Sequence, residues 1–579
     1  MTNSMSPLAA PGMVAQGTGA HAVVGALRRH GVNTIFGQSL PSMLHLVAER
    51  QGIRQIAYRT ENAGGYMADA YARVTGKIGV VTAQNGPAAA LLVPPLAEAL
   101  KASIPILALV QDVSAEHTDR NAFQDLDHIG MFTAVTKWVR RVTDVSRLED
   151  YVDQAMTAAC TGRPGPVVLM LPADILLQPY GSAKRSHSLG YYPLDRTTSA
   201  NERIEEAAEL LLNAKNPIVI AGGGVHLSAA QHELSALQEH CHLPVATTVM
   251  GKGSVDETHP LSVGVMTYFL GPNGSARYQR PLLENADVVL LIGTRTNQNG
   301  TDSWKLYPKN AIFIHLDIDG NEVGRNYESK RLVGDAKLTL AALTEAMQKR
   351  NLAQRKNSRS ALEKKIAEGR AAYLKESEPV RNAQSMPVRP ERIMQEIQSS
   401  LTAESIVVAD ASYSSIWIAN YLVALKAGMR FITPRGLAGL GWGFPMALGV
   451  KVAKPEKEVF CVVGDGGFGH VWSELETAAR MGIKVTLILI NNGILGYQKH
   501  AENVKFGDHT SAVHFNPVDH AAIARNSGCD GIRVTDPKEL ASALEQAKKN
   551  IGTTLIEVMC DENAFPPITF YTPDAAVIK

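Results

Sequence analysis

The sequence predicts an α/β protein made of three doubly wound parallel-sheet domains, and three observations support this. Short, unbroken apolar runs alternate with helical stretches along the chain, as in strands that are covered on both faces of a parallel sheet. The chain has 579 residues, a length that accommodates about three domains of ordinary size. Its composition, 45% hydrophobic and 20% charged, is that of a globular protein able to bury sizeable cores.

Polar and charged segments divide the pattern into blocks, and we expect domains at 18–178, 200–345 and 390–579. The segment 178–201 is polar and contains Gly and Ser, which is typical of a linker. The segment 348–390 is highly charged and has helical patterning, so we expect a linker that packs as a helix. The main strand candidates are Ile78–Ala83, Ile104–Val110, Pro166–Leu171, Pro217–Ala221, Val288–Ile292, Ile312–Asp317, Ser405–Ala409, Val459–Val463 and Val485–Ile490.

Composition argues against several functional classes. The net charge is +1 and no Lys/Arg-rich block occurs, so we expect neither a nucleic-acid partner nor binding to an anionic membrane. The five cysteines form no CxxC pair, which fits a reducing compartment without a disulfide framework or zinc site. Residues 1–19 resemble a disordered tail rather than a signal peptide, and no apolar run of about 18 residues is present. We therefore expect a cytoplasmic protein.

The most informative stretch runs from 459 to 496. A predicted strand leads into Gly464-Asp465-Gly466-Gly467, and after a helical segment a second strand ends in Asn491-Asn492-Gly493. Ligands of open α/β sheets bind at the carboxyl ends of strands, and glycines there let backbone N–H groups approach a phosphate. A carboxylate, an amide and a backbone carbonyl beside a diphosphate make an all-oxygen site suited to Mg²⁺. Either turn alone would be an ordinary loop, but both together are far more specific.

These motifs, with Asn492 27 positions after Asp465, resemble the signature of thiamine-diphosphate (ThDP) dependent enzymes. Within that superfamily the chain resembles the branch of acetohydroxyacid (acetolactate) synthase, pyruvate oxidase and benzaldehyde lyase. The resemblance covers almost the whole chain past residue 18. It implies that Asp465 and Asn492 bind Mg²⁺ through their side chains and Ile494 through its carbonyl, while Gly466 and Gly467 lie beside the diphosphate.

ThDP chemistry also needs a carboxylate at the aminopyrimidine ring, and Glu61 is the candidate. By position alone, Glu61 could be an acid placed in the first turn of a helix by the helix dipole. The surrounding stretch, ending in Tyr71-Ala72-Arg73-Val74-Thr75-Gly76, resembles the family segment around its catalytic glutamate. The resemblance makes Glu61 the proton relay. In the family this residue reaches cofactor held by a partner subunit, which implies a homodimer or homotetramer with active sites at the subunit interface.

Two further loops resemble cofactor-binding segments of the family. In 435–445, the backbone of Ala438 and Leu440 would bond the pyrimidine, and the Leu440 side chain would wedge between the cofactor rings. In 410–415, the backbone of Tyr413 and the hydroxyl of Ser414 would contact the diphosphate. Without the neighbouring motifs, a packing segment and a capping turn would explain these loops equally well.

Substrate residues are predicted by the same comparison. Phe123 and Gln124 match a first-domain segment near the substrate pocket, and Gln38 lies where relatives have a Pro-Gly-Gly loop. We assign Gln124 and Gln38 as catalytic candidates, and Phe123, His128 and Gln498 as candidates for the pocket wall.

Two differences concern the substrate. Residues 296–299 lack the arginine with which acetohydroxyacid synthases recognise the acceptor carboxylate, and the segment after 495 lacks that enzyme's tryptophan. Both argue against a simple acetolactate synthase.

The middle block carries Gly222-Gly223-Gly224, Gly293-Thr294-Arg295 and His315-Leu316-Asp317. Such segments of relatives bind FAD, an adenine nucleotide or nothing, and plain strand–helix turns are the alternative because no GxGxxG fingerprint is present. The resemblance implies an acetolactate-synthase-like function: a ThDP- and Mg²⁺-dependent lyase or decarboxylating carboligase (an acyl transferase) acting on a 2-keto acid or 2-hydroxyketone. The alternatives are a flavin-linked 2-keto acid oxidase of the same fold and a non-catalytic nucleotide-binding relative.

Overall fold

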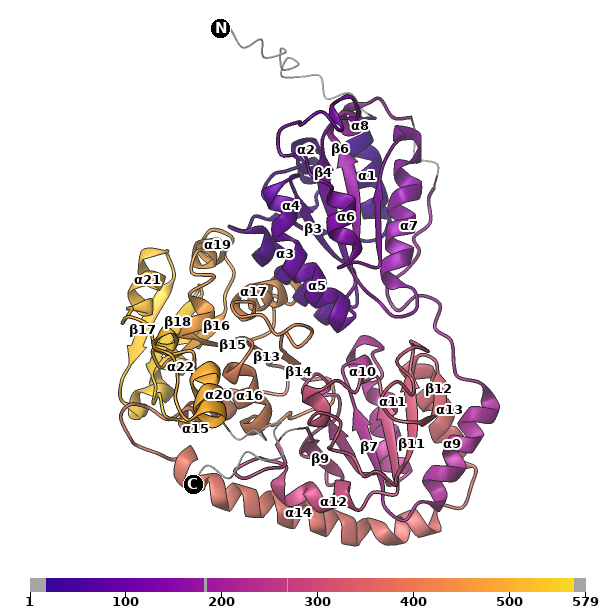
Figure 1. Ribbon diagram of the computed structural model, residues 1–579, viewed down its shortest axis with the longest axis vertical. Helices are drawn as coiled ribbons and strands as arrows, with labels where there is room; N and C mark the ends of the chain where they lie inside the picture. Colours follow the sequence, from indigo (N-terminus) through magenta and orange to yellow (C-terminus); the bar gives the residue numbers. More distant parts are fainter. Residues whose placement is uncertain (1–16, 182–184, 268, 567–579) are drawn as a thin grey trace.

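The computed structural model describes residues 17–181, 185–267 and 269–566, and within them it contains three six-stranded sheets with only parallel pairings. Helices cover the faces of each sheet, so the predicted fold class is confirmed (Figure 1). The sheets lie within the predicted domain ranges, whose limits stay predictions. Residues 1–16 of the predicted tail and 567–579 of the third range lie outside the described residues, and Gly19, expected in the tail, instead begins a helix.

The first sheet has the strand order β2-β1-β3-β4-β6-β5. Its strands are β1 (Thr34–Phe36), β2 (Arg54–Ile56), β3 (Gly79–Ala83), β4 (Ile106–Asp112), β5 (Trp138–Arg141) and β6 (Val167–Pro172). The helices around it are α1 (Gly19–Arg29), α2 (Ser42–Arg50), α3 (Glu61–Thr75), α4 (Pro87–Leu91), α5 (Val93–Ala102), α6 (His128–Thr133), α7 (Leu148–Cys160) and α8 (Ala173–Leu177).

The central sheet has the order β12-β11-β10-β7-β8-β9. Counted within the domain, this is the 3-2-1-4-5-6 order of dinucleotide-binding folds, with its switch point between β7 and β10. The strands are β7 (Pro217–Ala221), β8 (Val245–Thr247), β9 (Ser262–Val265), β10 (Val288–Ile292), β11 (Ile312–Asp317) and β12 (Ser329–Val333). The helices are α9 (Asn201–Asn213), α10 (Gly224–Leu227), α11 (Gln231–His240), α12 (Arg280–Glu284) and α13 (Ala336–Gln348).

The third sheet, β14-β13-β15-β16-β18-β17, repeats the topology of the first. Its strands are β13 (Ile406–Ala409), β14 (Arg430–Ile432), β15 (Val459–Gly464), β16 (Thr486–Asn491), β17 (Asp530–Val534) and β18 (Thr554–Met559). Its helices are α15 (Pro390–Ser400), α16 (Tyr413–Tyr421), α17 (Gly443–Ala453), α18 (Asp465–Phe468), α19 (Glu474–Arg480), α20 (Gly496–Phe506), α21 (His520–Asn526) and α22 (Leu540–Lys549).

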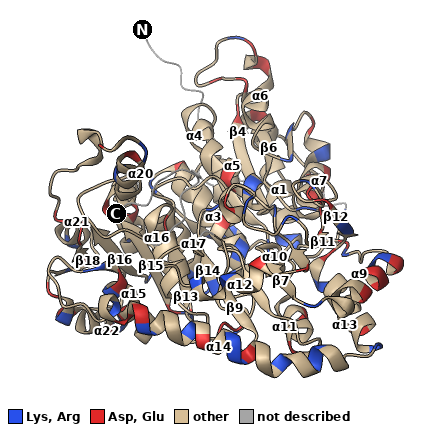
Figure 2. Cartoon of the chain, turned by 60° about the horizontal axis from the view of Figure 1, so that its bottom comes forward, with Lys and Arg blue, Asp and Glu red and all other residues tan. Residues whose placement is uncertain are grey.

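The charged segment between the second and third domains forms one long helix, α14 (Ala353–Arg381). It runs from the central to the third domain (Figure 1), and Lys/Arg and Asp/Glu residues alternate along it (Figure 2). It lies within the segment 348–390, where the sequence predicted a helix. Some predicted strand bounds shift by one or two residues, as for β4, expected at Ile104–Val110 and found at Ile106–Asp112.

Helices α3 and α17 join the first and third domains through one shared apolar core. Met67 of α3 and Phe444 of α17 are both fully buried in it. The two backbones approach so closely that a Cβ on Gly449 would lie 2.2 Å from the Met67 carbonyl oxygen. This packing fixes the start of α3 relative to the third sheet.

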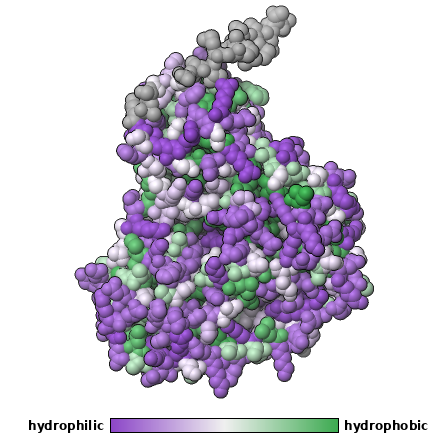
Figure 3. Space-filling model, turned by 180° about the vertical axis from the view of Figure 1, so that it is seen from behind, coloured by the Kyte–Doolittle hydropathy of each residue, from purple (hydrophilic) through white to green (hydrophobic). Residues whose placement is uncertain are grey.

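One face of the molecule is largely polar (Figure 3). The face seen in Figure 3 is mainly hydrophilic, and its apolar residues are scattered in small patches. Within the described ranges, the helices are too short or too polar for any of them to cross a bilayer.

Candidate active site

A cavity of about 560 Å³ opens at the carboxyl ends of β13, β15 and β16. This is the switch point of the third sheet, because the chain leaves β13 and β15 in opposite directions. Every residue predicted to bind the cofactor lines this cavity, as does the pocket candidate Gln498. The predicted residues are Tyr413, Ser414, Ala438, Leu440, Asp465, Gly466, Gly467, Asn492 and Ile494.

Three oxygen-bearing groups converge at one side of the cavity. One terminal atom of the Asn492 amide lies 3.1 Å from the Ile494 carbonyl oxygen and 3.3 Å from Asp465 Oδ1. The other Asp465 oxygen accepts a hydrogen bond from the Gly493 N–H at 2.9 Å. Burial raises the pKa of Asp465 to about 6, so a nearby cation would stabilise its ionised carboxylate. With the amide oxygen turned inward, this donor set fits Mg²⁺.

Asp410, which follows β13, holds the loop that closes this cavity. Its buried carboxylate accepts hydrogen bonds from the N–H groups of Gly441, Trp442 and Gly443 at 2.9–3.1 Å. The loop contains Ala438 at φ +63°, a backbone region that alanine seldom adopts. We infer that Asp410 keeps this loop in place, a role that sequence reasoning missed because the partners lie more than thirty positions apart.

Glu61 is the first residue of α3, with Thr60 as its N-cap. A buried carboxylate from the third domain, Glu474, accepts hydrogen bonds from the backbone N–H groups of Arg59 at 3.1 Å and Thr60 at 3.1 Å. The hydroxyl of Thr477 donates to the same carboxylate at 2.7 Å. The turn that carries Glu61 is therefore anchored to helix α19, which sequence reasoning did not identify.

Gln124 and Gln38 lie on loops of the first domain. Gln124 has φ +60°, and its Oε1 is buried without a hydrogen-bond partner among the described residues. The Asn85 side chain holds the loop by donating to the carbonyls of Phe123 and Gln124 at 3.2 and 3.0 Å. Gln38 is exposed, and its Nε2 donates to the Tyr58 carbonyl at 2.8 Å.

The remaining pocket candidates differ in exposure. Phe123 is 82% exposed. His128 is buried, its Nε2 accepts from the Gly86 N–H at 2.8 Å, and its pKa is lowered, mainly by burial. Gln498 is exposed and donates to Glu502 at 2.7 Å. Of these three, only Gln498 lines the cavity at the carboxyl ends of β13, β15 and β16.

The predicted site is thus divided within one chain. Glu61, Gln38 and Gln124 belong to the first domain and are not among the residues that line the cavity of the third. The groups assigned to the metal and diphosphate come together, whereas the groups assigned to proton transfer lie elsewhere on the same chain.

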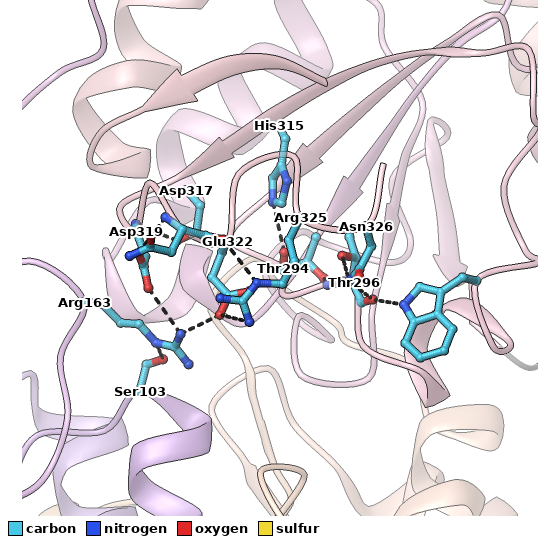
Figure 4. A network of polar contacts seen from close by, with 12 residues as sticks. Ser103, Arg163, Thr294, Thr296, His315, Asp317, Asp319, Glu322, Arg325 and Asn326 are labelled. Atoms are coloured by element: carbon cyan, nitrogen blue, oxygen red, sulfur yellow. Dashed lines mark hydrogen bonds and ion pairs between the residues drawn. The ribbon is translucent and has the colours of Figure 1, made fainter. Parts of the chain in front are cut away.

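A second cavity, of about 360 Å³, lies at the switch point of the central sheet. Gly224 and Gly293 line it, and a Cβ on Gly224 would lie 2.7 Å from the Gly293 Cα, so the two turns pack backbone to backbone. Figure 4 shows the polar network at its edge, where Arg163 reaches Glu322 at 2.7 Å. Asp317, at the end of β11, also lines the cavity, and burial raises its pKa to about 6.

Comparisons with known proteins agree with this geometry. Models of the N-terminal TPP binding, central and C-terminal TPP binding domains of thiamine pyrophosphate enzymes match residues 17–131, 204–343 and 410–558. The chain therefore belongs to the thiamine pyrophosphate enzyme family.

Within that family it lies in the acetolactate-synthase-like branch, as its motifs indicated. A probable acetolactate synthase large subunit from Methanococcus aeolicus is 33% identical over 550 residues, covering 91% of this chain and 90% of that protein. One from Methanocaldococcus jannaschii is 32% identical over 559 residues (94% and 92%). The acetolactate synthase isozyme 3 large subunit of Escherichia coli is 30% identical over 568 residues (95% and 96%).

Proposed function

We propose that this chain is a ThDP- and Mg²⁺-dependent carboligase of the acetolactate synthase type. It removes CO₂ from a 2-keto acid and transfers the remaining acyl group to an acceptor carbonyl. The observation that carries the proposal is the convergence of Asp465, Asn492 and Ile494 within a cavity lined by every predicted cofactor residue. The names of its relatives support the same chemistry.

The residues present fit the cofactor and its metal. When bound, ThDP supplies a carbanion that attacks a carbonyl carbon, and its ring then accepts the electron pair released with CO₂. Asp465, Asn492 and Ile494 would hold Mg²⁺ against the diphosphate, and the Leu440 side chain would set the angle between the rings. Glu61 would hold a proton at the aminopyrimidine.

Loops of the first domain would bind the acceptor substrate. Gln124 carries a buried oxygen without a partner among the described residues, so a substrate hydroxyl could donate to it. The exposed Gln38 amide would contact the same substrate from the neighbouring loop.

We propose that two copies of the chain complete each site, as a homodimer or a homotetramer of such dimers. The division of the site supports this, because Glu61 and the cofactor cavity occupy separate places on one chain. Exposed apolar side chains occur in both domains that carry the site, and a partner would cover them. They are Leu91, Phe123, Leu126 and Ile129 in the first domain, and Leu437, Tyr497 and Phe515 in the third. Sedimentation velocity checks the assembly, and a monomer at working concentration would contradict it.

We also propose that the central cavity holds FAD or an adenine nucleotide. The Arg295 guanidinium lines it and forms no hydrogen bond or ion pair within the part of the chain that the structure describes, which suits a phosphate. Gly224 and Gly293 let two turns pack backbone to backbone at the switch point, and both line the cavity there. Mass spectrometry of ligand released from the purified protein distinguishes FAD, an adenine nucleotide and an empty site.

The activity is tested by CO₂ release from a panel of 2-keto acids, pyruvate first, with ThDP and Mg²⁺ present. Release together with a condensed product, identified by mass spectrometry, supports the carboligase and names its donor. Cleavage of a 2-hydroxyketone without CO₂ release would indicate a lyase instead. Reduction of a bound flavin by substrate would indicate the oxidase alternative.

A further inference from the structure

A third cavity, of about 410 Å³, lies where the three domains meet. Its walls come from the end of α3, the segment around Tyr192, helix α10, and β14 with its preceding loop. Lys and Arg residues gather around β14 and α10 at the centre of the view in Figure 2. The cationic side chains that line the cavity are Arg73, Arg196, Lys426, Arg430, Lys454 and Lys457.

Most of these cations already have anionic partners. Arg73 contacts Asp69 at 2.5 Å and Glu98 at 3.3 Å, and Arg196 contacts Asp335 at 2.8 Å. At the exposed mouth, Lys426 and Lys457 share a single carboxylate, that of Glu404. These pairs leave Arg430 and Lys454 as the lining cations without an anionic partner among the described residues.

Arg430 lines the cavity and has no compensating anion among the described residues. Its guanidinium makes no hydrogen bond or ion pair to any residue that the structure describes, and its Nε is buried. Burial, partly offset by Tyr192, lowers the pKa of Arg430 to about 10, so it remains charged at neutral pH. The ammonium of Lys454 likewise has no ion pair among the described residues. Burying an unpaired charge costs free energy unless a counter-ion is supplied.

The neighbouring His226 cannot supply that counter-charge. Its Nε2 donates to the Lys252 carbonyl at 3.0 Å, and its Nδ1 accepts from Gln231 at 3.2 Å. Burial, together with the Arg430 cation, lowers the pKa of His226 to about 3, so the ring is neutral. The cavity lining therefore combines a neutral imidazole with an unpaired guanidinium.

We propose that this junction cavity binds a small anion that carries a phosphate group, held by Arg430 and Lys454. A guanidinium fork and an ammonium match the two charges of a phosphate or phosphate monoester. The volume far exceeds that of one water molecule, so there is room for an ester group. This site is separate from the cofactor cavity, and the inference does not rest on the proposed function.

The cavity borders elements that carry the proposed active site. Arg73 lies on α3, the helix that begins with Glu61, and its Nη1 donates to the Thr433 carbonyl just after β14 at 3.3 Å. Thr433 leads directly into the loop 435–440. An anion held by Arg430 and Lys454 would therefore lie beside this contact between the first and third domains.

The test uses the full chain saturated with ThDP and Mg²⁺, so that the diphosphate site is filled. Phosphate binding is measured by calorimetry and by the thermal unfolding midpoint, with chloride at equal ionic strength as reference. We expect phosphate, but not chloride, to raise the midpoint, and R430M and K454M to weaken phosphate binding about tenfold or more. Without phosphate, R430M should melt close to the wild type, because Arg430 makes no hydrogen bond or ion pair to the described residues that the substitution would remove.

R203M is the matched control, because it removes an exposed arginine of α9 that pairs with Glu206. It should bind phosphate as the wild type does. Tighter binding of glycerol 3-phosphate than of inorganic phosphate would identify an ester as the ligand, and the reverse order would identify the free ion. Equal phosphate responses in wild type and R430M, or equal effects of phosphate and chloride, would overturn the proposal.

Discussion

The carboxylate of Glu474 accepts a hydrogen bond from the backbone N–H of Thr60 at 3.1 Å. The two residues come from different domains and are 414 positions apart in the chain. Thr60 is the N-cap of α3, and Glu61 is the next residue. Because the Glu474 side chain is fully buried, this contact fixes the position of the proposed proton relay.

Removing that contact should lower turnover without changing the cofactor cavity. E474A leaves the N–H groups of Arg59 and Thr60 without their acceptor, and we expect kcat to fall about tenfold or more because Glu61 is misplaced. E474Q retains an accepting oxygen and should keep much of the wild-type kcat. Steady-state kinetics checks this, with ThDP binding as the control. If both variants lost only stability and kept kcat, Glu474 would have no positioning role.

Glu61 itself is tested by E61Q, which keeps the shape of the side chain but cannot relay a proton. We expect turnover to fall about 10²- to 10⁴-fold, with an unchanged thermal midpoint. E49Q, at an exposed glutamate of α2, is the matched control and should behave as the wild type. Activity of E61Q within a factor of a few of the wild type would refute the assigned role.

The division of the site between two copies predicts complementation. E61Q and D465N chains should each be inactive, yet a heterodimer purified through two different tags combines the intact Glu61 of one chain with the intact Asp465 of the other. We expect it to recover about half of the wild-type activity, because one of its two symmetric sites is complete. A heterodimer as inactive as its parents would place both halves of each site on one chain.

Loss of the metal should abolish cofactor binding. Chelation of Mg²⁺, or D465N, removes the bridge to the diphosphate, and we expect ThDP affinity to fall more than tenfold. Calorimetric titration with ThDP measures this. D508N changes an exposed carboxylate on the loop after α20 and should leave the affinity unchanged. ThDP binding that is indifferent to both chelation and D465N would contradict the metal assignment.

The stability of the central domain should depend on Asp317. Its pKa is about 6 in the folded chain and 3.8 in the unfolded chain, so the folded state is weakened as the pH rises from about 4 through 6. Above that range the ionised carboxylate costs about 3 kcal/mol. D317N avoids this cost, so at pH 8 it should unfold at a higher denaturant concentration than the wild type. The difference between the two midpoints should vanish near pH 4.

Denaturant unfolding of the nucleotide-free protein across this pH range measures the difference. D530N, at an exposed position of β17, serves as the control. Parallel pH profiles for wild type and D317N would show that Asp317 has an ordinary pKa.

Local signals in the sequence determined the fold class and half of the site. Apolar runs such as Val288–Ile292 predicted their strands to the residue, because strands buried on both faces need unbroken apolar side chains. Asp465 and Asn492 could be paired because both directly follow adjacent strands, whose carboxyl ends meet at one sheet edge. Such relationships follow from local periodicity and a single topological rule.

Only the tertiary structure decided the rest. Three features depend on packing between distant segments. Glu474 holds the turn before Glu61, Asp410 holds the loop 438–443, and Arg430 is left without a partner among the described residues. A carboxylate or guanidinium carries no local mark of its partner, because the same side chain is compatible with solvent, a backbone N–H or an ion pair. The partner is chosen when the domains pack and burial makes an unsatisfied group costly.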